Sequence, residues 1–173
     1  MLKVGLLGAG RIAGVHATAI TTNPGSTLVA VSDINAEAAA KLAAQYGAEA
    51  RSTDAILNDP AIDAVLIATS TDTHSDLIER ATAAGKAVLC EKPVDLSLAR
   101  AQACQQVVAK NGKPVMIGFN RRFDPNFSAL KAALAEMRSV RRSSVRSLML
   151  TMAIEPGLAR SGTSCVTLAA QVA

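Results

Sequence analysis

The sequence predicts an α/β fold, in which a doubly wound parallel sheet is covered by helices on both faces. Two observations predict this fold class. Half of the residues are hydrophobic, yet the chain contains only three Phe, one Tyr and no Trp, and a core of Ala, Val, Leu and Ile suits parallel strands packed between helices. Short apolar runs also alternate with helical patterns as far as about residue 118, which is typical of βαβ units.

The expected strands and helices follow one another along the chain. The strand-like runs cover residues 2–7, 27–32, 48–51, 62–68, 86–90 and 115–118. The helical patterns cover residues 11–21, 36–46, 72–84 and 96–110. Glycine follows the last turn of three of these helices, where it tolerates a left-handed conformation; these residues are Gly47, Gly85 and Gly112.

Two regions of different character are expected. Residues 1–120 should form the doubly wound domain, and residues 121–173 a connection with the incomplete or aberrant start of a second α/β domain. A helical pattern reaches about residue 137, after which Arg and Ser become frequent and residues 148–154 indicate one strand. This composition predicts a poorly ordered or prematurely ended segment; phosphate binding or regulation by the Arg cluster is the alternative.

The formal net charge of +4 does not indicate a nucleic-acid partner. Residues 1–137 contain 13 Lys and Arg and 13 Asp and Glu, so the whole excess lies in the tail. A basic surface on the folded domain is therefore not expected. The few aromatic residues also offer no stacking platform for bases.

Cysteine usage and the N-terminus predict a reduced, cytoplasmic compartment. Cys90, Cys104 and Cys165 show no CxxC pairing and no His at metal-ligand spacing, so neither a disulfide framework nor a metal site is expected. The apolar run at the N-terminus is broken by glycines and is too short for a signal segment. No run approaches the roughly 20 apolar residues that span a bilayer, so no membrane partner is expected.

A glycine turn joins the first strand to the first helix and predicts nucleotide binding. Its residues match the pattern G-x-G-x-x-G/A, and they are Gly8-Ala9-Gly10-Arg11-Ile12-Ala13. The first glycine permits the tight turn, the second lets the backbone approach a pyrophosphate, and the small third residue lets the helix pack closely. The helix N-terminus then offers free amides and a positive dipole end to the phosphates. The fold is therefore expected to be of the Rossmann type, with a dinucleotide cofactor.

Asp33 ends the second strand, about 20 residues after the glycines, where a carboxylate accepts hydrogen bonds from an adenosine ribose. It favours NAD over NADP, because a 2′-phosphate would face a carboxylate, and Ile34 and Asn35 offer no cation to offset the repulsion. The alternative role is an N-cap for the helix that begins near Ala36, and both roles are compatible.

A polar segment follows the strand over residues 62–68, at the sheet edge where ligands bind in open α/β folds. The segment is Thr69-Ser70-Thr71-Asp72-Thr73-His74. Asp72 or Thr71 is a candidate cap for the next helix. His74 either lies on the surface or touches the cofactor or substrate.

Lys92 follows the next strand, between Glu91 and Pro93. A lysine at the mouth of such a crevice can be partly desolvated and can donate to a substrate oxygen. In a hydride transfer it would polarise or orient the reacting alcohol or carbonyl. The alternative is a strand-end lysine in water, paired with Glu91.

Together these motifs resemble the Gfo/Idh/MocA oxidoreductase family, and within it the inositol 2-dehydrogenases. The resemblance covers about residues 1–137 and rests on the glycine turn and three segments, which are Ile67-Ala68-Thr69-Ser70-Thr71-Asp72-Thr73-His74, Cys90-Glu91-Lys92-Pro93-Val94-Asp95-Leu96 and Gly118-Phe119-Asn120-Arg121-Arg122-Phe123-Asp124. It implies oxidation of a ring hydroxyl of a small polyol or sugar, with transfer of a hydride to NAD.

The resemblance also implies roles for individual residues. Lys92 would be the catalytic residue that binds and polarises the reacting oxygen, with Asn120 and Arg121 on the substrate side. Pro93 would fix the turn that presents Lys92, with a cis peptide bond as one option. The residues implied in cofactor binding are Gly8, Ala9, Gly10, Arg11, Ile12, Asp33, Thr69, Ser70, His74, Glu91, Lys92 and Pro93.

The chain departs from the family in the second domain, which supplies the substrate wall, an Asp, a general-base His and often the homo-oligomer interface. No His follows His74, and the only acid after Glu136 is Glu155. Loss of a general base costs roughly 10²- to 10⁴-fold in rate. We expect a product that is truncated or shifted in reading frame near Met137. The alternatives are another sugar dehydrogenase of the family and a short, non-catalytic NAD-binding module.

Overall fold

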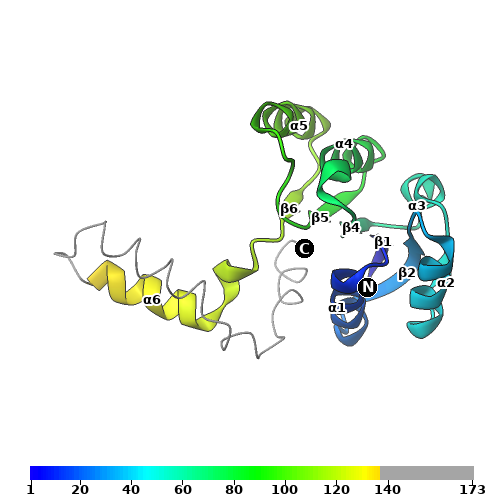
Figure 1. Cartoon of the computed structure of the whole chain (residues 1–173), viewed down its shortest axis with the longest axis horizontal. Helices are drawn as coiled ribbons and strands as arrows, with labels where there is room; N and C mark the ends of the chain where they lie inside the picture. The colour runs from blue at the N-terminus through cyan, green and yellow to red at the C-terminus, as the bar shows by residue number, and fades with distance from the viewer. Residues whose placement is uncertain (137–173) are drawn as a thin grey trace. The chain divides into compact units, whose positions relative to one another are not determined.

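The protein contains a six-stranded parallel sheet with helices on both sides (Figure 1), which confirms the predicted Rossmann-type α/β fold. The structure is a computed structural model and describes residues 1–136. The strands are β1 (Leu2–Leu7), β2 (Ser26–Ser32), β3 (Glu49–Ala50), β4 (Ala64–Ile67), β5 (Ala87–Cys90) and β6 (Val115–Ile117). Their order is β3-β2-β1-β4-β5-β6, so the direction of winding reverses between β1 and β4.

Helices connect the strands in the predicted order, and glycines end three of them. The helices are α1 (Arg11–Thr22), α2 (Ala36–Gln45), α3 (Thr53–Asn58), α4 (His74–Ala83), α5 (Leu98–Asn111) and α6 (Pro125–Glu136), with the 3-10 turns η1 (Thr71–Thr73) and η2 (Asn120–Phe123). Gly112 caps α5 with a φ of 65° and donates its N–H to the Val108 carbonyl. Gly47 and Gly85 take the same left-handed conformation after α2 and α4, as predicted.

The side chains of the strands alternate between two core layers, one on each face of the sheet. Leu6 and Leu66 pack in the layer that contains residues of α1 and α2. Their neighbours Leu7 and Ile67 pack in the other layer, with residues of α3, α4 and α5. Burial of each such side chain contributes about 2 kcal/mol. Both layers therefore hold the sheet rigid beneath the loops at its carboxyl edge.

Two local predictions differ from the structure. Helix α3 was not expected, because six residues are too few to show a helical period; Ser52 caps it by accepting a hydrogen bond from the Ala55 amide. The helix expected from residue 72 instead begins as η1, and α4 starts at His74. Thr73 occupies the N-cap of α4 without a side-chain cap bond, so the capping role suggested for Thr71 or Asp72 is wrong.

A second compact unit begins at Asn120. Within it, Asp124 accepts hydrogen bonds from the amides of Asn126 and Ser128 at the start of α6, through its side chain and its carbonyl respectively. The expectations for residues 138–173, including the strand over residues 148–154 and the Arg cluster, lie outside the described residues. Within residues 1–136, none of the helices is long and apolar enough to cross a membrane.

Candidate functional site

The carboxyl ends of β1, β4 and β5 lie level with one another at the point where the winding reverses. Leu7 pairs with Ile67, and Ile67 pairs with Cys90, so the three strands end in one row. In open α/β sheets this edge is where ligands bind. The loops that leave these strands therefore bring together the glycine turn, the segment that begins at Thr69, and Lys92.

The glycine turn (residues 8–10) has a backbone that requires glycine at its first position. Gly8 has a φ of 107°, and a Cβ atom there would lie 2.5 Å from the Ala68 carbonyl oxygen. Its N–H donates to the Ser32 carbonyl (2.7 Å), which fixes the turn to the end of β2. Gly10 differs, since a Cβ atom there would meet nothing within 4 Å. Gly8 is thus constrained by the protein itself, whereas the space beside Gly10 is open to a ligand.

Gly10 is also the N-cap of α1, and the first turn of this helix suits an anion. No side chain caps the helix at Gly10, and its first turn, which includes Arg11 and Ile12, contains no acidic residue. The amides of a helical first turn have no partner within the helix and carry the positive end of its dipole. A phosphate at this position would accept hydrogen bonds from them.

Asp33 ties the glycine turn to the end of β2. One carboxylate oxygen accepts a hydrogen bond from the Ala9 amide (2.6 Å), and the other accepts one from the Asn35 amide (2.8 Å). Asn35, rather than Asp33, is the N-cap of α2, so the alternative capping role of Asp33 is wrong. Ile34 between them is fully exposed. The Asp33 carboxylate therefore lies beside the glycine turn, and its contact with a ribose stays a prediction.

His74 lies beneath the loops, with 1% of its surface exposed. Its Nδ1 is 2.7 Å from the Pro93 carbonyl oxygen, and its Nε2 is 3.1 Å from the Thr69 carbonyl oxygen. The suggestion that His74 is a surface residue is therefore wrong. Thr69 and Ser70 are joined to the 3-10 turn η1 by the Thr73 hydroxyl. This hydroxyl bonds the Thr69 hydroxyl and the Ser70 carbonyl, each at 2.7 Å.

Lys92 is exposed at the start of the loop after β5 (residues 91–97), and the peptide bond to Pro93 is cis. The exposure of Lys92 agrees with the alternative interpretation of a lysine in water, but its side chain forms no ion pair with Glu91, whose carboxylate accepts from Lys92 only the hydrogen bond of the amide (3.3 Å). The Glu91 carboxylate lies 2.8 Å from Nε2 of His16, and no ion pair of Lys92 occurs in the described part of the chain. The hydrogen bond from His16 lowers the pKa of Glu91, although burial opposes this.

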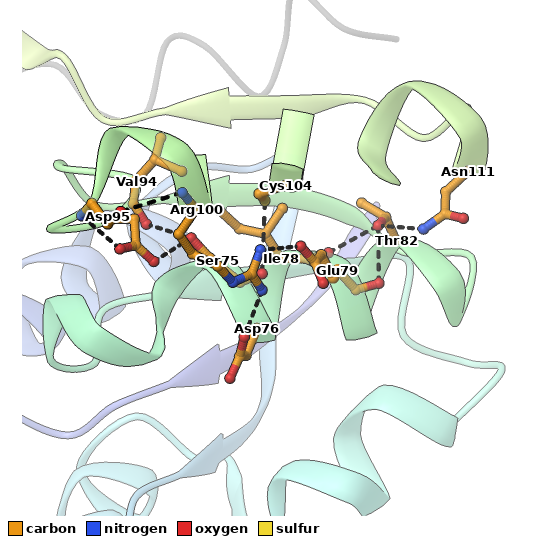
Figure 2. Close-up of polar contacts among 11 residues, drawn as sticks. Ser75, Asp76, Ile78, Glu79, Thr82, Val94, Asp95, Arg100, Cys104 and Asn111 are labelled. Carbon is orange, nitrogen blue, oxygen red and sulfur yellow. Dashed lines mark hydrogen bonds and ion pairs between the residues drawn. The ribbon is translucent and has the colours of Figure 1, made fainter. Parts of the chain in front are cut away.

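Several residues that hold this loop were not found from the sequence. The Ser75 hydroxyl donates to the Val94 carbonyl (3.2 Å) and to the Asp95 carboxylate (2.7 Å), as Figure 2 shows. The pKa of Asp95 is lowered, chiefly by this bond. In the same interface Arg100 of α5 contacts two carboxylates of α4, those of Asp76 and Glu79. The only indication of the contact with the loop in the sequence was Ser75, a polar residue at a position of the helix that is buried.

The two predicted substrate residues lie in the second compact unit. Asn120 and Arg121 are both in η2. The Arg121 guanidinium lies 5.0 Å from the centre of the Phe127 ring and 3.9 Å from the Asp124 carboxylate. Their role toward a substrate remains a prediction.

Known proteins with related sequences share this region. An inositol 2-dehydrogenase of Rhizobium meliloti (strain 1021) is 52% identical over 137 residues, which are 79% of this chain and 42% of the relative. A solved structure described as a putative myo-inositol dehydrogenase from Sinorhizobium meliloti 1021 is 51% identical, with a TM-score of 0.76, over 80% of this chain and 42% of that one. The chain thus spans less than half the length of these relatives.

A third comparison concerns a protein with ligands. The scyllo-inositol dehydrogenase from Lactobacillus casei, solved with NAD(H) and scyllo-inositol, is 30% identical with a TM-score of 0.74, over 79% of this chain and 41% of that one. The sequence pattern of the oxidoreductase family with an NAD-binding Rossmann fold, Gfo/Idh/MocA, matches residues 2–119. The chain therefore belongs to the Gfo/Idh/MocA oxidoreductase family.

Proposed function

We propose that this chain is the cofactor-binding part of an NAD-dependent oxidoreductase that acts on a ring CH–OH group, of the inositol 2-dehydrogenase type. The observation that carries the proposal is the level row of strand ends, which places the glycine turn and the Lys92 loop at one edge of the sheet. The 52% identity to an inositol 2-dehydrogenase supports a polyol substrate.

The cofactor assignment rests on the geometry around β1 and β2. The amides of Gly10, Arg11 and Ile12 would hold the pyrophosphate at the N-terminus of α1. Asp33, fixed by the Ala9 amide, would accept hydrogen bonds from the adenosine ribose. Its negative charge would repel the 2′-phosphate of NADP, so NAD is the proposed cofactor. NAD, when bound, supplies the acceptor for the hydride.

Lys92 is the proposed catalytic residue. Its exposed ammonium, which has no ion-pair partner in residues 1–136, is available to donate a hydrogen bond to the reacting oxygen of the polyol. This bond would orient the alcohol and stabilise the negative charge that develops when its proton leaves. Thr69, Ser70, Glu91 and Pro93 would border the cofactor on the same side. Asn120 and Arg121 would contact the substrate.

A non-catalytic NAD-binding module is the second candidate, and one observation favours it. The chain has two His, and both His16 and His74 are buried and contact other protein groups. Neither is available to remove the proton of an alcohol. The free, buried Cys90 and Cys104 fit the proposed cytoplasmic location, and a homo-oligomer like those of the family is proposed only for a chain with a second domain.

Calorimetric titration of the 173-residue chain with NAD and with NADP tests the first step, and absorbance of NADH formed with myo-inositol tests the second. Tighter binding of NAD followed by turnover supports the oxidoreductase, and binding without turnover supports the module. Absence of binding would reject both. Lys92→Ala should keep nearly the parent affinity for NAD and remove turnover, whereas Lys92→Arg keeps the charge and should retain part of the rate. An unchanged rate in Lys92→Ala would remove the catalytic role.

A further inference from the structure

Two buried histidines hold the residues on either side of Lys92. His16 lies in α1 and bonds the Glu91 carboxylate at 2.8 Å. His74 lies in α4 and bonds the Pro93 carbonyl at 2.7 Å. The two residues are only 2% and 1% exposed. Since α1 and α4 contribute to core layers on opposite faces of the sheet, the residues before and after Lys92 are contacted from both faces, Glu91 through its carboxylate and Pro93 through its carbonyl.

The chemistry of these contacts defines which atoms carry the protons. A carbonyl oxygen only accepts hydrogen bonds, and so does an ionised carboxylate. His16 therefore donates from Nε2, and a hydrogen bond between His74 and the Pro93 carbonyl requires a proton on Nδ1. The Nε2 atom of His74 also faces a carbonyl, that of Thr69, at 3.1 Å. His74 thus connects the loop after β4 to the loop after β5.

The rest of the Lys92 loop makes few contacts of its own. The side chains of Lys92, Pro93, Leu96 and Ser97 are exposed. Beyond the two histidines, the loop is held by the Ser75 hydroxyl at Val94 and Asp95. The Glu91 amide also donates to the Ile67 carbonyl (2.9 Å), and Val94 packs against the core. The imidazole contacts add anchors from two helices at the residues directly before and after Lys92.

We propose that His16 and His74 are positioning residues, which set the place of Lys92 and of the loop that borders the nicotinamide end of the cofactor. This inference rests on the proposed function. It assigns the histidines no contact with substrate and no proton transfer. The competing view, in which they are ordinary core residues, predicts a general loss of stability with no selective effect on this loop.

The experiment compares two ligands on the 173-residue chain. NADH has a nicotinamide and ADP-ribose does not, so both use the glycine turn and Asp33 while only NADH reaches the Lys92 loop. The ratio of their dissociation constants reports on the loop, and a uniform loss of stability leaves the ratio unchanged. Hydrogen exchange of residues 91–95 reports on the same loop without any cofactor.

The variants separate the individual donors. In His74→Asn the side-chain NH₂ takes about the place of Nδ1 and keeps the bond to Pro93, whereas in His74→Gln it takes about the place of Nε2 and keeps only the bond to Thr69. His16→Gln keeps the donor to Glu91, and His16→Leu removes it. We expect His74→Gln and His16→Leu to weaken the binding of NADH about tenfold relative to that of ADP-ribose, which is the effect of one lost charge-assisted or buried hydrogen bond. Both variants should also speed hydrogen exchange in residues 91–95. His74→Asn and His16→Gln should remain near the parent ratio.

The outcomes are distinguishable from failure of the proposed function. If the parent chain binds NADH no more tightly than ADP-ribose, the nicotinamide assignment fails, and exchange in the variants still tests the two contacts. If His74→Gln and His16→Leu leave both the ratio and the exchange at the parent values, the positioning proposal is overturned. It is also overturned if both variants lose NADH and ADP-ribose binding equally, because the histidines then act only on the stability of the fold.

Discussion

The two halves of the candidate site are built by different means. Around β1 and β2 the site is held mainly by the backbone. Gly8 has a φ of 107° and donates its N–H to the Ser32 carbonyl, and the Ala9 amide donates to Asp33. Around β4 and β5 the loops are held by side chains from the helices, such as His74 and Ser75. The first half depends on backbone geometry beside one carboxylate, whereas the second can change with its side chains.

The largest effect is expected for a substitution in the glycine turn, on the side of the site that the backbone builds. Gly8→Ala places a Cβ atom 2.5 Å from the Ala68 carbonyl at a φ that alanine rarely adopts. We expect a loss of about 3 kcal/mol in the free energy of unfolding and loss of NAD binding, measured by urea denaturation and calorimetry. Gly10→Ala is the matched control, because its Cβ atom meets no protein atom. Gly10→Ala should keep the free energy of unfolding of the parent and weaken only the binding of NAD. Equal stability in both variants would contradict the role of Gly8.

Asp33→Ala should produce the next largest effect. The substitution removes the acceptor for the Ala9 amide and the proposed ribose contact. We expect NAD binding to weaken about tenfold and the preference for NAD over NADP to shrink, because the repulsion of the 2′-phosphate disappears. Titration with both nucleotides measures the two effects together. A preference that stays at the parent value would refute the ribose assignment.

Glu91→Gln tests the side of the site that side chains hold, because its effect on the free energy of unfolding should depend on pH. The hydrogen bond from His16 lowers the pKa of Glu91 from its ordinary value of 4.5. The carboxylate therefore contributes its full stability above that value, and the contribution is lost as the pH falls through the lowered pKa. Thermal unfolding should show that the free energy of unfolding of the variant is about 1 kcal/mol lower than that of the parent at neutral pH. This difference should disappear in acid. A gap that widened toward low pH would contradict the assignment.

The smallest effect is expected for an exposed ion pair between helices. Arg80 contacts Asp54, and their side chains are 49% and 76% exposed. Arg80→Ala should change the free energy of unfolding by less than about 0.5 kcal/mol, by urea denaturation, and leave ligand binding at the parent level. A loss as large as that of Glu91→Gln would show that surface pairs also hold this half of the site.

Short-range patterns made the backbone half predictable. The glycine turn and Asp33 were found because each role needs a particular residue directly after a strand. The side-chain half depends on contacts between distant residues. His16 lies 75 residues before Glu91, and nothing near His16 in the sequence indicates that partner. The burial of His74 was missed for the same reason, because its two acceptors are backbone carbonyls, which no residue type reveals. Helix α3 was too short to show a period.

The strand order has a consequence for a chain that is still being made. β1 is central, and β2, its partner on one side, follows after a single helix. Its partner on the other side, β4, begins only at Ala64. Until that segment leaves the ribosome, one edge of β1 has no strand to bond, and such an edge invites pairing with other chains. Closure of the sheet at β4 and β5 depends on non-local contacts, which form slowly. The crevice at the winding reversal is therefore complete only after β4 and β5 have been made.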